Sequence, residues 1–426
     1  MKIKIITSVI FLYIITVQLL ELFIESELQS ILIFKFTLFE IGVIASIFLT
    51  IILIIFNPVK DNFHNRLFIT ALIGLFLYQL IIVAPVLFVQ GVSFKEIAYA
   101  VFRKSYFLVI PFFYYFLFPN FKKNSTPILI INLSGTVLLL LYIYNYFNGI
   151  IDHTSTGEVR IASGASTILF AFMLITNFSL FSQHKNNFFF LIISLLGLIF
   201  ANHKSAYLGV FILTLFSLIN LNRIKNKFRI AIQVSILLIL IIVPLTQIPF
   251  IADNFWGRVT SSFTTDDPNA DSRFEQYEMA WEFFIQHPLN GSMINSKFYF
   301  DESMNNIPPH SFIFQLLATQ GIIGFVIHTF LISLIIYISY KNRRDSYSFQ
   351  MFLLILFYLV FTLLNENFYS SRNIMIFNFA AALILYRNKC IENAKGYILS
   401  FTSINSISGK NRVGKLKIFP KQNETR

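Results

Sequence analysis

The chain has 426 residues, of which 56% are hydrophobic and only 13% are charged, and its formal net charge at pH 7 is +12. Soluble domains carry about 25% charged residues and could not cover so much apolar surface with polar side chains. The composition therefore excludes a soluble globular protein and indicates a chain whose apolar surface is covered by lipid. The excess of basic residues fits membrane topology and does not indicate a nucleic-acid partner.

Twelve apolar segments follow one another along the chain, and about 20 such residues cross a bilayer as a helix. The expected spans are 4–24, 36–56, 67–89, 105–118, 127–147, 161–181, 187–201, 205–220, 229–248, 311–339, 349–364 and 372–387. Lys2 and Lys4 precede the first segment as in a signal peptide, but no small-residue cleavage site follows, so a span is expected there. The sequence therefore predicts an all-α, polytopic membrane protein with about 12 transmembrane helices, and residues 1–388 form a single membrane domain.

The distribution of charge places both termini in the cytoplasm. With that orientation, twelve basic residues of the inner loops, two at the N-terminus and nine from Arg387 onward make 23 of the 33 basic residues. The same inner segments hold only four of the 21 acidic residues. Because inner loops of membrane proteins are rich in Lys and Arg, the large loop at about 249–310 is expected outside the cytoplasm. Residues 389–426 are expected to form a basic, disordered cytoplasmic tail.

The outer loop 249–310 contains the sequence pattern of one amphipathic helix. Ser272 and Glu275 have the spacing of a capping box at its start, and Pro288 ends it. Four aromatic residues recur at helical spacing between these points: Phe274, Tyr277, Trp281 and Phe284. Such a helix is expected to lie on the membrane or on the outer end of the helical bundle.

Several cations fall on the outer side. Arg273 is expected in the first turn of this helix, where the dipole disfavours a cation unless an anion binds beside it. A salt bridge to a neighbouring aspartate is the alternative. Four further cations lie close to the outer ends of spans: Arg160, Lys204, Arg258 and Arg372. Each of them alone is typical of a membrane anchor, but together they suit a phosphate or diphosphate headgroup.

His310 stands between Pro308-Pro309 and the tenth span. A neutral imidazole at this place can accept a proton from a hydroxyl group, and a structural role is the alternative. The spacing Asp267-x-Asn269-x-Asp271 is similar to a calcium loop, but its sixth position is Ser272 rather than glycine. The sequence therefore predicts no metal site.

Four short motifs combine these residues. His310-Ser311 is followed, after nine further residues, by Gly321-Ile322-Ile323-Gly324. Arg273 is followed by Trp281 and by His287-Pro288-Leu289-Asn290-Gly291, Arg160 is followed by Gly164, and Arg258 follows Gly257. Together these motifs, over residues 157–326, resemble those of the bacterial O-antigen ligases and O-antigen polymerases.

The resemblance implies a glycosyltransferase of the bacterial inner membrane. Such an enzyme moves a glycan from undecaprenyl diphosphate to an acceptor hydroxyl on the outer side, without a metal, nucleotide sugar or other cofactor. Carried over by position, Arg160 and Arg273 would hold the diphosphate, and His310 would orient or deprotonate the acceptor hydroxyl. Lys204 stands where the family often has an arginine, and Lys204, Arg258 and Arg372 are expected to bind substrate.

Other functions stay open at this point. In a ligase of lipopolysaccharide biosynthesis the acceptor is a glycolipid, whereas in a polymerase it is another lipid-linked repeat. A protein-directed oligosaccharyltransferase is a third variant. A transporter or flippase of lipid-linked sugars is the alternative from another class, but Glu21, Lys35 and Glu40 fall toward the outer ends of their spans. The lack of a charge clearly in mid-membrane favours chemistry at the surface over a path through the protein.

Overall fold

The fold was analysed on a computed structural model. It describes residues 2–23, 38–56, 61–89, 97, 101, 106–121, 125–148, 152–153, 159–160, 162, 166–180, 187–201, 268–291, 311–363 and 371–407. The N-terminal half begins with α1 (Lys2–Phe23), α2 (Leu38–Phe56) and a continuous helical stretch made of α3 (Phe63–Tyr78), the π-helical turn η2 (Gln79–Val83) and α4 (Ala84–Val89). A second continuous stretch consists of η3 (Tyr106–Leu108), α6 (Val109–Phe112), η4 (Phe113–Leu117) and η5 (Phe118–Asn120). The helices α7 (Ser125–Phe147), α8 (Thr167–Leu180) and α9 (Asn187–Ala201) follow. The C-terminal half contributes α13 (Pro268–Gln286), α14 (Phe312–Lys341), α15 (Ser346–Leu363) and α16 (Ser371–Ile407).

Apart from α13, each described helix overlaps a predicted span. Within the described part of the chain, five helical stretches are long and apolar enough to cross a membrane: Phe63–Val83, Ser125–Phe147, Phe312–Lys341, Ser346–Leu363 and Ile374–Ala394. Shorter apolar helices lie at Ile5–Val17, Glu40–Ile52, Tyr106–Asn120, Thr167–Asn177 and Asn187–Ala201. The spans expected at 205–220 and 229–248 lie outside the described residues. The helical, multi-pass membrane fold is thus confirmed, and the total of about twelve spans stays a prediction.

One small feature departs from an all-helical chain. Two strands of two residues each, β1 (Asp152–His153) and β2 (Val159–Arg160), pair in antiparallel register, with Asp152 opposite Arg160. They lie in the loop between the fifth and sixth predicted spans, where the chain has left the bundle and a short hairpin can satisfy its backbone.

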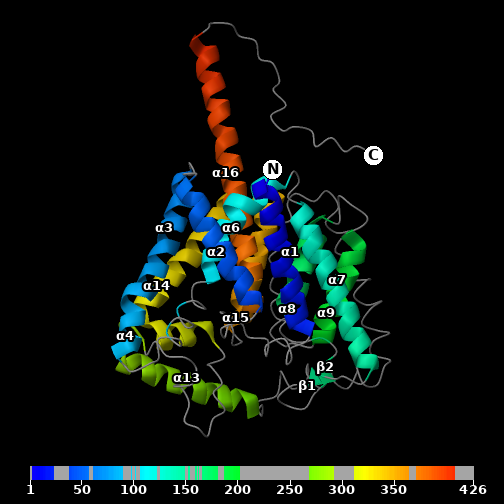
Figure 1. Cartoon of the computed structure of the whole chain (residues 1–426), viewed down its shortest axis with the longest axis vertical. Coiled ribbons are helices and arrows are strands. Elements are labelled where there is room, and N and C mark those ends of the chain that lie inside the picture. Colours follow the sequence, from blue (N-terminus) through cyan, green and yellow to red (C-terminus); the bar gives the residue numbers. More distant parts are fainter. Residues whose placement is uncertain are drawn as a thin grey trace.

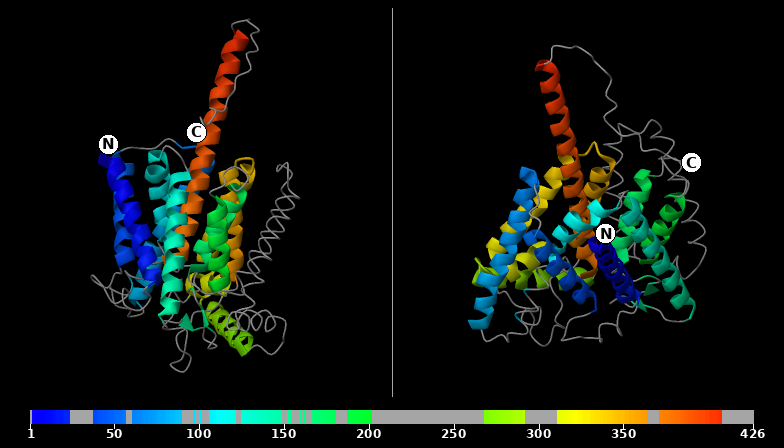
Figure 2. Two further views of the ribbon diagram at one scale, coloured as in Figure 1. Left: turned by 90° about the vertical axis from the view of Figure 1, so that its right-hand side faces the viewer. Right: turned by 45° about the horizontal axis from the view of Figure 1, so that its top comes forward.

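The two ends of the helical bundle carry different elements. Figure 1 shows the start of α1 and the protruding end of α16 at one end, with α13, β1 and β2 at the other. The turn between α14 and α15 lies at the same end as the start of α1 (Figure 2). This arrangement agrees with the predicted topology, in which the N-terminus and the tail share one side and the large loop lies on the opposite side.

The first half of α16 is the central helix of the bundle. Residues Ala380 to Leu385 are fully buried. The Phe379 ring packs against aromatic rings from three other elements, with centroid distances of 5.1 Å to Phe118, 5.8 Å to Phe172 and 6.0 Å to Phe113. Small residues at 380–382 let neighbouring helices approach closely, which is how helices associate in lipid, where the hydrophobic effect cannot drive them together.

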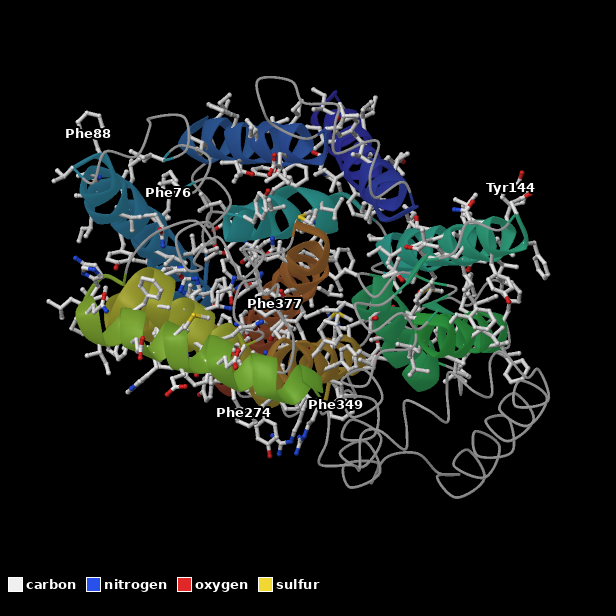
Figure 3. The ribbon with its side chains drawn as sticks, turned by 90° about the horizontal axis from the view of Figure 1, so that it is seen from below. Phe76, Phe88, Tyr144, Phe274, Phe349 and Phe377 are labelled. Carbon is white, nitrogen blue, oxygen red and sulfur yellow. The ribbon has the colours of Figure 1, made fainter. Side chains whose placement is uncertain are left out.

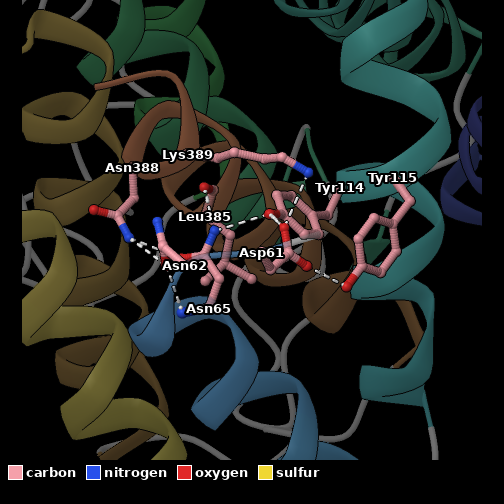
Figure 4. Close-up of polar contacts among 8 residues, drawn as sticks. All are labelled: Asp61, Asn62, Asn65, Tyr114, Tyr115, Leu385, Asn388 and Lys389. Carbon is pink, nitrogen blue, oxygen red and sulfur yellow. Dashed lines mark hydrogen bonds and ion pairs between the residues drawn. The ribbon is translucent and has the colours of Figure 1, made fainter. Parts of the chain in front are cut away.

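A buried polar network joins α16 to other spans at the end where α1 begins (Figure 4). Asp61 accepts hydrogen bonds of 2.5 Å from the hydroxyl groups of Tyr114 and Tyr115, and its carboxylate pairs with Lys389 Nζ at 3.0 Å. Asn65 Nδ2 donates to the Tyr114 hydroxyl at 2.9 Å. The Asp61 side chain is only 1% exposed, so these partners offset the cost of removing its charge from water.

Helix α16 is longer than the predicted span. The tail was expected to begin at residue 389, yet α16 continues as a helix to Ile407 and extends beyond the bundle (Figures 1 and 2). Asn388 donates to Asn65 Oδ1 at 2.8 Å, and Lys341 pairs with Glu392 at 3.2 Å. These contacts hold the residues directly after the span, as far as Glu392. Residues 408–426 lie outside the described residues.

Candidate functional site

Helix α13 lies across the end of the bundle opposite to the Asp61 network and packs on the first part of α14 (Figure 3). The rings of Tyr277 and Phe314 are stacked, with centroids 4.7 Å apart and planes within 8°. Ala280 and Ala318 are buried and pack in one cluster, so the two helices meet through small side chains. The helix predicted in the outer loop is therefore present, and it rests on the bundle.

Two details of this helix differ from the prediction. It begins at Pro268 rather than at Ser272, because proline suits the first helical position, where its missing N–H needs no partner. Arg273 consequently lies in the second turn, where the helix dipole has less influence on it. The packed face contains Gln276 and Ala280, whereas Phe274 and Trp281 of the predicted aromatic stripe are exposed.

The end of α13 continues into a tight turn that contains the Pro288-Leu289-Asn290-Gly291 motif. Gly291 N donates to His287 O at 2.8 Å, and Gly291 has a positive φ of 67°. Left-handed backbone of this kind is common in glycine directly after a helix end. The turn is held against α14 by its own carbonyl groups: Ile322 N donates to Pro288 O at 2.9 Å, and Ile323 N donates to Leu289 O at 3.3 Å.

Helix α14 is broken at the place where this turn binds. Gly321 has φ 62° and ψ −165°, which is not helical and is a conformation open almost only to glycine. A Cβ atom on Gly321 would lie 2.5 Å from Gly291 N, and a Cβ atom on Gly291 would lie 2.5 Å from Gln320 N. The two glycine motifs named in the sequence analysis therefore touch each other, backbone against backbone. We refer to residues 288–291 and 319–323 together as the glycine clip.

Tyr78 of α3 and Gln79 of its π-helical turn support the glycine clip through Gln320. Gln79 Nε2 donates to Gln320 Oε1 at 2.8 Å, and the Tyr78 hydroxyl donates to the Gln320 carbonyl at 3.1 Å. Gln79 and Gln320 are fully buried, and Gln79 Oε1 has no hydrogen-bond partner. Gly324, the last glycine of the motif, leaves room for the Gln320 side chain. Sequence reasoning missed these residues, although a glutamine inside each of two apolar spans was a usable signal.

The structure brings three of the predicted site positions toward one end of the bundle. Arg273 lies on α13 and Arg160 in β2, both at the end opposite the start of α1, and Arg372 is the second residue of α16, which begins toward that end (Figure 1). For these three residues the backbone alone is described. His310 lies outside the described residues, but Ser311, the next residue, is buried at the start of α14.

Lys204 and Arg258 also lie outside the described residues, so their predicted roles stay predictions. Among the side chains that the structure describes, no three histidines, cysteines, aspartates or glutamates gather as a metal site. The glycine clip determines how α13 and the start of α14 lie relative to each other.

Comparison with known proteins agrees with the motifs. Residues 189–329, about a third of the chain, match the family model described as O-antigen ligase. The match includes most of α9, all of α13 and both halves of the glycine clip, and it ends eight residues after the break at Gly321. No curated protein matches the chain. The chain is therefore a multi-pass membrane protein with a region, residues 189–329, that is similar to the O-antigen ligase family.

Proposed function

We propose that the protein transfers a glycan from undecaprenyl diphosphate to the hydroxyl group of an acceptor glycolipid on the outer face of the bacterial inner membrane. The family supports O-antigen ligase-like glycan transfer in general. The donor, the acceptor and the side of the membrane are the parts that we add. No family match supports the transporter or flippase considered as the alternative from another class.

The glycine clip is the observation that carries this proposal. It joins α13, which bears Arg273, to the part of α14 whose first residues follow His310. The contact uses two backbone hydrogen bonds and two glycines that tolerate no side chain, so it holds the two helices in one relative position. Transfer from a diphosphate needs a cation at the leaving group and a base at the acceptor at a constant separation, because charge stabilisation depends on preorganised groups.

The proposed reaction assigns a role to each group. The acceptor oxygen attacks the anomeric carbon of the glycan, and its proton passes to the imidazole of His310. The bond between the anomeric carbon and the diphosphate oxygen breaks, and the electron pair leaves with that oxygen. Arg273 and Arg160 neutralise the growing charge of the undecaprenyl diphosphate, because an arginine can donate two parallel hydrogen bonds to phosphate oxygens. Lys204, Arg258 and Arg372 are proposed to bind the same anionic substrate.

The test uses purified variants in lipid nanodiscs with an undecaprenyl-diphosphate-linked glycan and an acceptor glycolipid. We expect His310→Ala to lose about 10²–10⁴ in rate and Arg273→Ala to lose about 10²–10³. Arg273→Lys should recover only part of the rate, because lysine cannot bind a diphosphate with two parallel bonds. Arg343→Ala is the matched control, since Arg343 lies at the other end of the bundle over the Tyr340 ring.

The product of the reaction distinguishes the proposed ligase from a polymerase. A glycan joined to the acceptor glycolipid identifies a ligase, whereas a longer glycan on undecaprenyl diphosphate identifies a polymerase that uses the same site. If Arg273→Ala and His310→Ala are folded and transfer glycan at the rate of Arg343→Ala, these residues are structural and the assignment is wrong.

A further inference from the structure

Helix α13 has two apolar faces, and only one of them packs on the protein. Gln276 and Ala280 are buried on the face toward α14. On the other side, Phe274 is 68% exposed, Trp281 46% and Ile285 59%. At 100° per residue these three side chains lie within about 40° of one another around the helix axis. They form one continuous stripe, which we call the outer stripe.

The outer stripe points away from the bundle. Phe274 lies on the side of α13 that faces outward, whereas Phe377 of α16 lies near the centre of the same view (Figure 3). Three exposed glutamates, Glu275, Glu278 and Glu282, occupy the helix surface next to the stripe. The exposed surface of α13 is thus divided lengthwise into an apolar strip and an acidic strip, the pattern of a helix that lies at a boundary between lipid and water.

The glycine clip determines the depth of α13. After the break at Gly321, α14 continues for 20 residues to Lys341, and at 1.5 Å per residue this part is about 30 Å long. That length equals the hydrocarbon thickness of a typical bilayer. Arg343 and Arg344 come two and three residues after Lys341, and these charges must lie in the interface on their side of the membrane. Gly321 therefore lies near the opposite boundary of the hydrocarbon layer, and the clip holds the end of α13 at that level.

Exposed apolar side chains are also found beyond α13, on the turn that follows it and on α14. Leu289, in the turn after α13, is 63% exposed. Its neighbour Pro288 accepts the hydrogen bond from Ile322, and Ile322 and Val326 are exposed on the spanning part of α14. Exposed apolar side chains thus occur on α13, on the turn after it and on the part of α14 that follows the break.

We propose that the outer stripe of α13 inserts into the outer interface of the lipid bilayer. Phe274, Trp281 and Ile285 contact the region where headgroups meet acyl chains, and the glutamate strip faces water. Tryptophan is enriched at this depth because its ring is apolar and its N–H needs a polar partner. The acidic strip gives no attraction to anionic lipid, so apolar burial holds the helix there and added salt should not release it.

The insertion has a consequence that rests on the proposed function. Arg273 directly precedes Phe274, so the membrane contact keeps this position at the level of lipid headgroups. A lipid-linked diphosphate lies at the same level. The helix thus matches the depth of the proposed cation to the depth of the phosphate groups.

Fluorescence of Trp281 tests the insertion without any substrate. The chain has two tryptophans, so Trp256→Phe leaves Trp281 as the single reporter. The protein is placed in nanodiscs of phosphatidylcholine brominated at acyl positions 6,7 or 11,12. We expect both lipids to quench Trp281, with the larger loss from bromine at 6,7. The control carries Trp256→Phe, Trp281→Phe and Glu282→Trp, which moves the reporter about 100° around the helix, and it should lose clearly less fluorescence.

Three results would overturn the proposal: no quenching of Trp281, stronger quenching from the deeper bromines, or equal quenching at positions 281 and 282. If the Trp256→Phe protein does not fold, the same signal is obtained as the difference between the wild type and Trp281→Phe. Glycan transfer is measured separately on the same nanodiscs. An inactive protein whose Trp281 is quenched would disprove the proposed function and leave the membrane contact standing.

Discussion

Replacing Gly321 with alanine tests the central contact of the site. Gly321 has a positive φ that strains any other residue by about 1–3 kcal/mol. The added Cβ would also lie 2.5 Å from Gly291 N, so the turn after α13 must move away. Moving it weakens the two backbone hydrogen bonds to Ile322 and Ile323, each with a net contribution of about 0.5–1.5 kcal/mol. We expect Gly321→Ala to lower the free energy of unfolding by about 2–6 kcal/mol.

The same substitution should affect transfer more than folding. Alanine favours an unbroken α14, in which Ile322 and Ile323 would donate to carbonyl groups of their own helix instead of to Pro288 and Leu289. The end of α13 would then lose its attachment, and Arg273 and His310 would lose their constant separation. We therefore expect a folded fraction of Gly321→Ala that retains little transfer activity.

Gly74→Ala is the matched control, since Gly74 lies in α3 with no atom near its missing Cβ. Alanine is the better helix former by about 0.5–1 kcal/mol, so this variant should be as stable as the wild type or more stable. Thermal unfolding in nanodiscs, together with the transfer assay, measures both variants. If Gly321→Ala unfolds at the same temperature as Gly74→Ala and is equally active, the break in α14 does not hold the site.

Two further predictions concern the opposite end of the bundle and the topology. Asp61→Ala removes a buried carboxylate with three partners and should lower the free energy of unfolding by about 3–5 kcal/mol. Glu392→Ala breaks a partly exposed ion pair and should change the free energy of unfolding by less than about 1 kcal/mol. Equal shifts in the thermal unfolding of the two variants would contradict the role of the Asp61 network. In a Cys390→Ala background, a membrane-impermeant thiol reagent added to intact spheroplasts should label Glu278→Cys on α13 and leave Arg344→Cys unlabelled. The reverse labelling would place the proposed site in the cytoplasm.

The sequence by itself determined where most of the described apolar helices lie. Inside lipid a backbone must satisfy its own hydrogen bonds, so an apolar run of sufficient length becomes a helix whatever surrounds it. Pro288 likewise ended the helix of the outer loop as predicted, because proline lacks the N–H that would continue it. The motifs that resemble the O-antigen ligases could be recognised without coordinates for the same reason: they are local strings of residues.

Only the tertiary structure decided how these elements act together. The packing face of α13 could not be read from its sequence, because the helix has one apolar face for protein and another that is exposed, and periodicity does not distinguish them. The break at Gly321 depends on backbone atoms of Leu289, about thirty residues earlier, and lies inside an apolar run that reads as one helix. Asn388 and Lys389 of α16 contact Asn65 and Asp61, which lie more than 300 residues earlier. Contacts between positions so far apart in the chain arise only when the helices have packed, so local pattern carries no information about them.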